Sequence, residues 1–299
     1  MQICSFLPSA TEILYALGLG DSVAGVTFEC DFPPEAATKS IVVDTNLAHG
    51  LTSAEIDATV NDYSSHGDGL YRIDIEKLEA LKPDLVVTQE LCDVCAISTS
   101  YVAKAIHRLS LKPQVLSLTP HTLDDVLKDI LRVGEATGRD AKARDLVKGL
   151  RERIDTIGQM SKLQRPTVVC LEWLSPPFNG GHWIPEMIKL AGGMDPLGKL
   201  GQDSYRMKWD EVLRVDPDVV VVMPCGHNLK RSVEEYRGTQ FPDGWKQVKA
   251  VGNGRVYAVN ASAYFSRPGP RLITGLEIMH SLLQEDRPQE ILANSWARL

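Results

Sequence analysis

The sequence lacks any apolar run near the roughly 20 residues that a helix needs to cross a bilayer. It also lacks an excess of positive charge, because its 32 Lys and Arg and 39 Asp and Glu give a net charge of −7. This balance argues against nucleic acid or an anionic membrane as the main partner. Six cysteines in 299 residues are too few for a disulfide-stapled secreted module. We expect a monomeric globular protein that does not span a membrane and binds a small molecule, with room for two domains.

Familiar catalytic signatures are also missing. The sequence contains no Gly-x-Ser-x-Gly and no His-Glu-x-x-His motif, so the usual hydrolase and zinc-protease patterns are absent. The segment 193–200 resembles a phosphate-binding loop, but it lacks the final Ser or Thr and follows a predicted helix instead of a strand. We therefore predict no phosphate-binding loop.

One pattern of residues occurs twice. Leu78–Val87 contains the end of an amphipathic helix, a Pro-Asp corner and a β-branched run, and Val212–Val221 repeats this order. Two copies of one unit predict two α/β lobes, with a ligand cleft between them that the strand-end loops line.

Short β-branched runs without alternation predict strands that are buried on both faces. Helical patterns alternate with these runs, so the sheets should be mainly parallel and flanked by helices. The predicted strands are Ile3–Leu7, Val23–Val26, Ile41–Val43, Leu85–Thr88, Val115–Leu118, Val168–Leu171, Val219–Met223 and Val256–Val259.

The domain boundaries follow from the helical stretch in the middle of the chain. We expect an N-terminal α/β lobe over 1–121, bridging helices over 122–164 and a C-terminal α/β lobe over 165–299. The long bridging helix should run from Asp140 to Leu163, and no Gly/Ser-rich linker is present, so the connection should be stiff. Residues 46–72 have no counterpart in the second half, and we predict that they form an insertion near the cleft mouth.

The loops that follow the predicted strands carry the candidate ligand-binding residues. Aromatic residues are only 6% of the sequence, yet five in the second half fall near strand ends, and flat rings suit a large planar ligand. These aromatic candidates are Trp173, Phe178, Trp183, Tyr264 and Phe265. The polar candidates in such loops are Glu29, Gln89, Glu90 and Arg267. The alternative for each ring taken singly is packing in the core.

Cys92 and Cys95 form the most specific short motif of the sequence, Cys-x-x-Cys. Thiolates at this spacing can share a metal or form a redox disulfide, and the motif lies at a predicted helix start after a strand. Residues after other predicted strands could complete a soft-metal site: Cys30, Cys225 and His227. The alternative is that all of these are structural loop residues. Cys4 and Cys170 lie inside predicted strands, and we expect them in the core.

Eight stretches across both halves carry a family resemblance: Ser5–Glu12, Cys30–Pro34, Leu81–Val86, Pro176–Gly181, Leu190–Gly193, Trp209–Leu213, Pro217–Val221 and Ser266–Arg271. They resemble the class III periplasmic binding proteins of ABC importers, in the branch that binds cobalamin and iron–siderophores. Within that branch, the cobalamin-binding members are the most similar. The resemblance covers nearly the whole chain except residues 46–72.

The resemblance implies two lobes bridged by a long helix, with a ligand clamped between strand-end loops and delivered without catalysis. Aromatic residues of the cleft loops contact cobalamin in such proteins, and the matching positions of the first lobe here are Pro8 and Phe32. A second implied partner is an importer permease, which docks on an acidic residue of each lobe. Residues 94–112 depart from that pattern, because they contain no acid and offer Lys104 and Arg108 instead.

We therefore predict a protein that binds a cobalamin-like corrinoid or a related metal chelate, as a ligand and not as a catalytic cofactor. The alternative is a thiol-metal or thiol-redox enzyme that uses Cys92 and Cys95 on the same scaffold. A third possibility is a module that binds an unrelated small solute. Because a predicted strand follows Met1 directly, with no leader between them, the expected compartment is the cytoplasm. The alternative compartment is the periplasm or the cell surface, if a leader has been removed.

Overall fold

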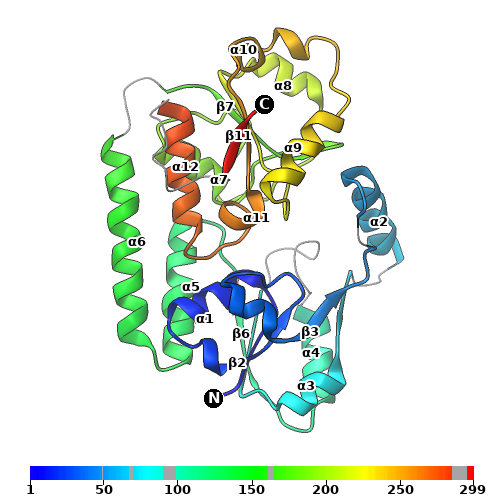
Figure 1. Ribbon diagram of the computed structural model, residues 1–299, viewed down its shortest axis with the longest axis vertical. Helices are drawn as coiled ribbons and strands as arrows, with labels where there is room; N and C mark the ends of the chain where they lie inside the picture. Colours follow the sequence, from blue (N-terminus) through cyan, green and yellow to red (C-terminus); the bar gives the residue numbers. More distant parts are fainter. Residues whose placement is uncertain (49, 67–69, 90–98, 161–164, 285–294) are drawn as a thin grey trace. The chain divides into compact units, whose positions relative to one another are not determined.

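The protein is described by a computed structural model that covers residues 1–48, 50–66, 70–89, 99–160, 165–284 and 295–299. The chain divides into two compact units (Figure 1). The first comprises Met1–Pro120 and Asp124–Lys148, and the second comprises His121–Leu123 and Gly149–Leu299. The division therefore falls inside a helix, α6 (Asp140–Met160). The predicted three-part division, with 122–164 as a separate connection, stays a prediction.

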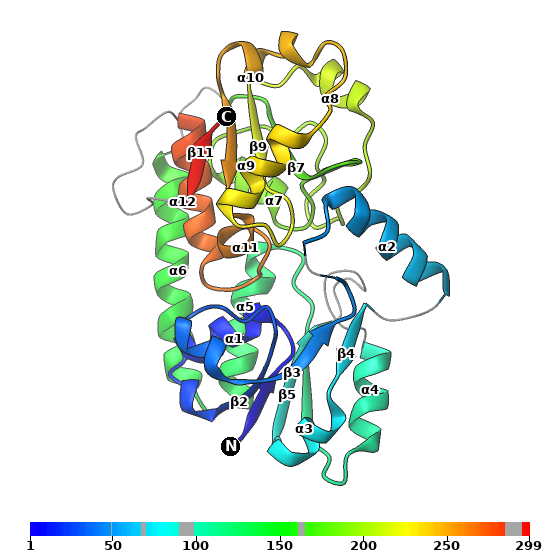
Figure 2. The same cartoon turned by 45° about the vertical axis from the view of Figure 1, so that its right-hand side comes forward.

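The first unit contains, within the described residues, a six-stranded sheet in the order β4-β3-β2-β1-β5-β6. Its strands are β1 (Ile3–Ser5), β2 (Val23–Thr27), β3 (Ser40–Thr45), β4 (Tyr71–Ile73), β5 (Leu85–Gln89) and β6 (Gln114–Leu118). Neighbouring strands are parallel except for β3 and β4. Its helices are α1 (Pro8–Ala16), α2 (Ser53–His66), α3 (Ile75–Leu81), α4 (Thr99–Arg108) and α5 (Leu123–Ala136). Helices α3 and α4 lie beside this sheet (Figure 2), and their buried side chains belong to the same core cluster as residues of its strands.

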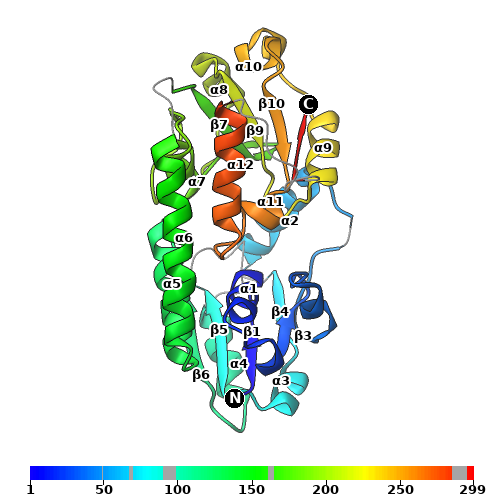
Figure 3. The ribbon, with the colours of Figure 1, turned by 60° about the vertical axis from the view of Figure 1, so that its left-hand side comes forward.

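The second unit contains, in the part of the chain that is described, a five-stranded sheet in the order β11-β10-β9-β7-β8. Its strands are β7 (Val168–Leu174), β8 (Pro177–Asn179), β9 (Val219–Val222), β10 (Val256–Val259) and β11 (Trp296–Arg298). The three central strands are parallel, and both edge strands are antiparallel. Its helices are α7 (Ile184–Leu190), α8 (Trp209–Val215), α9 (Leu229–Gly238), α10 (Lys249–Gly252), α11 (Ala261–Tyr264) and α12 (Leu272–Gln284). Helices α7 and α12 pack against each other (Figure 3).

The sequence repeat corresponds to a structural repeat. Lys82 follows the last residue of α3 and Asp216 follows the last residue of α8, and both cap residues have a left-handed backbone with a φ of 47°. The Pro-Asp corner follows in each copy and leads into β5 or β9. Asp84 Oδ2 accepts a hydrogen bond from the backbone N–H of Gln2, at 2.6 Å, so the corner is fastened to the residue before β1. The repeated motif thus sets where each helix ends and where the next strand begins.

Three short strands were not predicted: β4, β8 and β11. Each has three residues, lies at a sheet edge and pairs antiparallel. Edge strands are half solvated, so they do not show the continuous apolar run that identifies the central strands. The end of the segment 46–72, predicted to be an insertion, instead contributes Tyr71 and Arg72 to β4. Helix α6 ends at Met160, and the remaining predicted residues up to Leu163 lie outside the described ranges.

No helix within the described ranges combines the length and the apolar character needed to cross a membrane.

Candidate functional site

In the first unit, the predicted ligand-binding residues that the structure describes differ in exposure. Pro8 is the first residue of α1, where a proline costs no hydrogen bond, and it is half-buried. Phe32 follows β2 and is 40% exposed. Glu29 is half-buried, whereas Gln89, the last residue of β5, is buried. Glu90, Cys92 and Cys95 lie outside the described residues, so their predicted roles stay predictions.

Cys30 belongs to a buried polar chain. Its Sγ lies 3.0 Å from the Oγ1 of Thr11, which in turn lies 2.8 Å from the Oγ of Ser5. Ser5 donates to the carbonyl of Leu7 at 2.9 Å, and all three side chains are almost inaccessible. Cys30, which was predicted as a possible soft-metal ligand, thus lies with its thiol packed against α1. Cys4 and Cys170 are buried as predicted.

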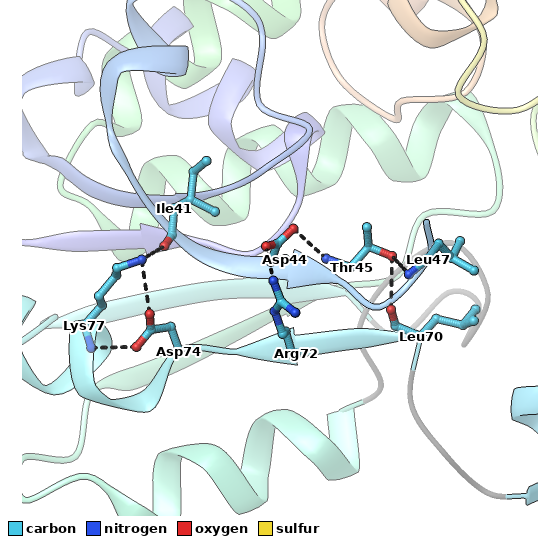
Figure 4. Close-up of polar contacts among 8 residues, drawn as sticks. All are labelled: Ile41, Asp44, Thr45, Leu47, Leu70, Arg72, Asp74 and Lys77. Atoms are coloured by element: carbon cyan, nitrogen blue, oxygen red, sulfur yellow. Dashed lines mark hydrogen bonds and ion pairs between the residues drawn. The ribbon is translucent and has the colours of Figure 1, made fainter. Parts of the chain in front are cut away.

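A depression of about 220 Å³ lies along the antiparallel edge of the first sheet. Figure 4 shows the polar contacts of the residues around it. Arg72 contacts Asp44 across β3 and β4 at 2.6 Å, and Lys77 contacts Asp74 at 3.1 Å. These charges face solvent and satisfy one another, and exposed ion pairs of this kind contribute little energy. The depression therefore offers a ligand few unsatisfied groups.

In the second unit, hydrogen bonds join the loops at the carboxyl ends of the parallel strands β7, β9 and β10. The backbone N–H of Cys225, after β9, donates to the carbonyl of Glu172, in β7, at 3.1 Å. The N–H of Ser262, after β10, donates to the carbonyl of His227 at 2.9 Å. We name the segments 172–176, 223–228 and 260–267 the carboxyl-end loops. In open α/β sheets, ligands bind at this end of the strands.

Trp173 and His227 meet in these loops. Their ring centroids are 5.6 Å apart at an interplanar angle of 53°. His227 is only 2% exposed, and burial together with Arg231 lowers the pKa of His227 to about 4, so the ring is neutral at pH 7. Among the described residues, neither ring nitrogen of His227 nor the indole nitrogen of Trp173 has a hydrogen-bond partner. Buried polar atoms without partners are uncommon in proteins, and a ligand is one way to satisfy them.

Two predicted cleft aromatics are core residues instead. Trp183 is 5% exposed and Phe265 is 2% exposed. The indole Nε1 of Trp183 donates to the carbonyl of Phe265 at 2.8 Å, which ties the start of α7 to the residue after α11. Their rings serve packing within this unit, so the prediction that they line a ligand cleft is wrong. Sequence position near a strand end did not distinguish them from the other three.

The other predicted ligand-binding residues of this unit remain partly accessible to solvent. Trp173, Phe178 and Tyr264 are half-buried. Guanidinium groups lie over two of these rings, Arg206 over Phe178 at 5.7 Å and Arg271 over Tyr264 at 5.8 Å. The remaining predicted residues are Arg267, which is half-buried, and Cys225, which is exposed. The carboxyl-end loops thus combine open aromatic surface with unsatisfied nitrogen atoms.

Among the described residues, three side chains lie close enough together to hold one metal ion, and the sequence did not suggest this group. Ligand atoms of His121, His182 and Asp203 all lie within 4.8 Å of one another. Neither Cys30, Cys225 nor His227 belongs to this group, which differs from the predicted metal site. A sequence signal existed for His121, which closely follows the predicted strand Val115–Leu118, but nothing in the sequence links it to His182 or Asp203.

Relatives and solved structures agree with this architecture. The uncharacterized ABC transporter substrate-binding lipoprotein YvrC of Bacillus subtilis is 29% identical over 300 residues, covering 97% of this chain and 82% of the relative. The periplasmic vitamin B12-binding protein of Vibrio cholerae superposes with a TM-score of 0.70 at 23% identity, covering 96% of this chain and 98% of that one. The periplasmic heme-binding protein RhuT of Roseiflexus sp. RS-1 gives a TM-score of 0.71 at 20% identity, covering 95% and 98%.

These comparisons correct the predicted compartment. The relatives are lipoproteins or periplasmic proteins, so the prediction of a cytoplasmic location is wrong.

The family itself is established by a match over most of the chain. The model of the periplasmic binding protein family matches residues 3–263, which run from the first strand of one unit to α11 of the other. Its members are substrate-binding proteins and not enzymes, and they work with ABC transporter permeases. The alternative prediction of a thiol enzyme is therefore not retained. This chain belongs to the periplasmic binding protein family.

Proposed function

We propose that this protein binds a cobalamin-like corrinoid outside the cytoplasmic membrane and delivers it to an ABC importer permease. The observation that carries the choice of ligand is the Trp173–His227 pair, with its half-buried indole and its ring nitrogens that have no hydrogen-bond partner among the described residues. A corrinoid is a large, partly apolar macrocycle that carries amide groups and a metal. Aromatic faces bury such a ring, and unsatisfied nitrogens favour a ligand with polar edges.

Two further observations support a macrocyclic metal chelate. Phe178 and Tyr264 add half-buried rings to the same unit as Trp173. Relatives of similar fold are named as binders of vitamin B12 and of heme, both of which are metal macrocycles. Heme is the second candidate, because the neutral imidazole of His227 is of the type that serves as an axial ligand to iron.

The test is a direct comparison of the two ligands. Purified protein is titrated with cyanocobalamin and, separately, with hemin, and binding is followed by calorimetry and by the absorption spectrum. We expect cobalamin to bind with a dissociation constant near or below about 1 μM, which corresponds to about 8 kcal/mol. Tighter binding of hemin, with a spectral change that His227→Gln removes, would select the second candidate. Absence of heat and of spectral change with both ligands would refute the proposal.

A matched pair of variants locates the site. Trp173→Ala should weaken cobalamin binding about tenfold, since one buried aromatic contact contributes about 1–2 kcal/mol. Tyr101→Ala is the control, because Tyr101 is an aromatic residue of α4 that is 40% exposed and lies outside the carboxyl-end loops. Equal losses in both variants would contradict the placement of the ligand on these loops. Circular dichroism should show that both variants fold.

A further inference from the structure

His121, His182 and Asp203 come from three separate segments of the second unit. His121 precedes α5, His182 precedes α7, and Asp203 lies in the loop between α7 and α8. The imidazole rings of His121 and His182 are stacked, with centroids 5.8 Å apart and an interplanar angle of 29°. His182 Nε2 lies 3.1 Å from Asp203 Oδ1. We name these three residues the two-histidine site.

The backbone holds His182 in place. Its N–H donates to the carbonyl of Gln202 at 2.6 Å, and its own carbonyl accepts from the N–H of Gly201 at 3.0 Å. These two bonds fix His182 against the loop that carries Asp203. His182 has a φ of 52°, in the left-handed region that a residue with a side chain rarely adopts. The neighbouring Gly181 packs so closely on the backbone of Ser204 that any Cβ there would collide with it.

His121 is fixed by a different contact. Two residues after it, the backbone N–H of Leu123 donates to Glu186 Oε2 at 2.9 Å. Glu186 lies in the first turn of α7, directly after the segment that holds His182. Both histidines are thus held near the start of α7, His182 by its position in the sequence and His121 through the bond from Leu123 to Glu186.

His182 and Asp203 face each other at ion-pair distance. In its neutral form an imidazole carries one lone pair that can bind a metal ion. The two atoms are within 3.1 Å, but Nε2 does not have hydrogen-bond geometry toward any described residue. A ring nitrogen and a carboxylate oxygen that face each other in this way are arranged as two ligands of one shared cation would be.

The distances between the ligand atoms of the two-histidine site fit a shared metal ion. In a tetrahedral zinc site with bonds of 2.0–2.1 Å, neighbouring ligand atoms are about 3.3 Å apart. The His182–Asp203 distance is close to this value, and the other separations in the site are at most 4.8 Å. Because His121 and Asp203 are exposed, their side chains can close the remaining gap by rotation.

We propose that His121, His182 and Asp203 bind a divalent transition-metal ion of the zinc type, with a fourth position open to water or to another ligand. Two imidazoles and one carboxylate suit Zn²⁺, Cu²⁺ or Ni²⁺, whereas Mg²⁺ and Ca²⁺ prefer oxygen ligands throughout. The bound ion would join the residue before α5 to the two segments around α7. This site is distinct from the carboxyl-end loops and does not depend on the identity of the macrocyclic ligand.

The experiment uses protein stripped of metal with a chelator, in a Cys92→Ser, Cys95→Ser, Cys225→Ser background that removes competing thiols. Titration with Zn²⁺ by calorimetry should show one equivalent per chain, and Zn²⁺ should raise the melting temperature. Co²⁺ should give the visible absorption of a low-symmetry site with nitrogen and oxygen ligands. Mg²⁺ at the same concentration should produce neither effect.

Variants then assign the ligands. His182→Gln and His121→Gln should each weaken Zn²⁺ binding at least about tenfold, and Asp203→Asn should do so by a similar factor, because each removes one of three protein ligands. The matched controls, His107→Gln and Asp243→Asn, alter exposed residues outside the site and should bind Zn²⁺ like the parent. His121→Gln is the decisive variant, since its exposed side chain can be replaced without disturbing the core.

Some outcomes would overturn the proposal. These are no stoichiometric Zn²⁺ binding in the parent, equal affinity in the parent and in His121→Gln, or an equal loss in the His107→Gln control. Because cobalamin and Zn²⁺ are titrated separately, failure of zinc binding and failure of corrinoid binding are distinguishable results.

Discussion

Asp218 accepts a hydrogen bond through Oδ2 from the backbone N–H of Thr167, at 2.8 Å. The same bond joins Asp84 to Gln2 in the other unit. In each case the aspartate of a Pro-Asp corner secures the residue before the first strand of its own sheet. The backbone N–H of Asp218 also donates to the carbonyl of Thr167 at 2.9 Å, so the two residues are held by a pair of bonds.

Asp218→Ala should lower the free energy of unfolding by about 1–2 kcal/mol, because the Thr167 N–H loses its partner in a partly buried position. Asp218→Asn should recover most of this loss, since the amide oxygen can accept the same bond. Urea denaturation measures both variants. The exposed Asp243→Ala is the control, and it should change stability by less than about 0.5 kcal/mol. A loss in the control as large as in Asp218→Ala would contradict the assigned role.

Gly275 allows α12 to approach α11. A Cβ at this position would overlap the carbonyl oxygen of Tyr264, which belongs to the backbone and cannot rotate away. Gly275→Ala should therefore destabilise the protein by more than about 2 kcal/mol. Gly149→Ala, in the middle of α6, meets no atom within 4 Å and should instead stabilise it by about 0.5–1 kcal/mol. Thermal melts of the two variants should shift in opposite directions, and shifts of the same sign would count against this account.

His227 should make stability depend on pH in a defined window. The pKa of His227 is lowered from 6.5 to about 4 by burial and by Arg231. Between these two values the unfolded chain binds a proton that the folded chain does not, so the free energy of unfolding falls as pH falls. The loss should reach at most about 3 kcal/mol at the lower end and be absent above the upper end.

His227→Gln provides the comparison for that window. The variant cannot titrate at this position, so its stability should vary less with pH between 6.5 and 4 than that of the parent. Urea denaturation at several pH values gives both curves, and carboxylates that titrate in the same range contribute equally to each. Parallel curves for the two proteins would mean that His227 is not buried as the structure describes.

Cys225 should react fastest with a thiol probe among the cysteines in the described residues. It is exposed, whereas burial raises the pKa of Cys4 to about 12 and raises that of Cys170 well above its ordinary value. Cys30 is buried against Thr11. Mass spectrometry after brief alkylation should show labelling of Cys225 at least about tenfold above these three. Cys92 and Cys95, which lie outside the described residues, are labelled in the same experiment.

The sequence predicted the central strands well because their signal is local. The β9 strand is four consecutive valines, and a run of that kind has one stable environment, the middle of a sheet. The edge strand β4 has Tyr-Arg-Ile and depends on its antiparallel pairing with β3, which no local pattern encodes. The site residues followed the same rule. Strand-end positions drew attention to Trp173 and His227, whose ring centroids lie 5.6 Å apart, but they did not predict that Trp183 would be buried.

The order of strands in the second sheet has a consequence for folding. Strand β11, at 296–298, is formed by the last residues of the sequence and is the edge partner of β10. Until β11 pairs, β10 presents an unpaired strand edge, and such an edge can pair with strands of other chains. A folding intermediate of this unit that lacks the β10–β11 pair therefore offers a strand edge to a second chain, and the complete fold covers it.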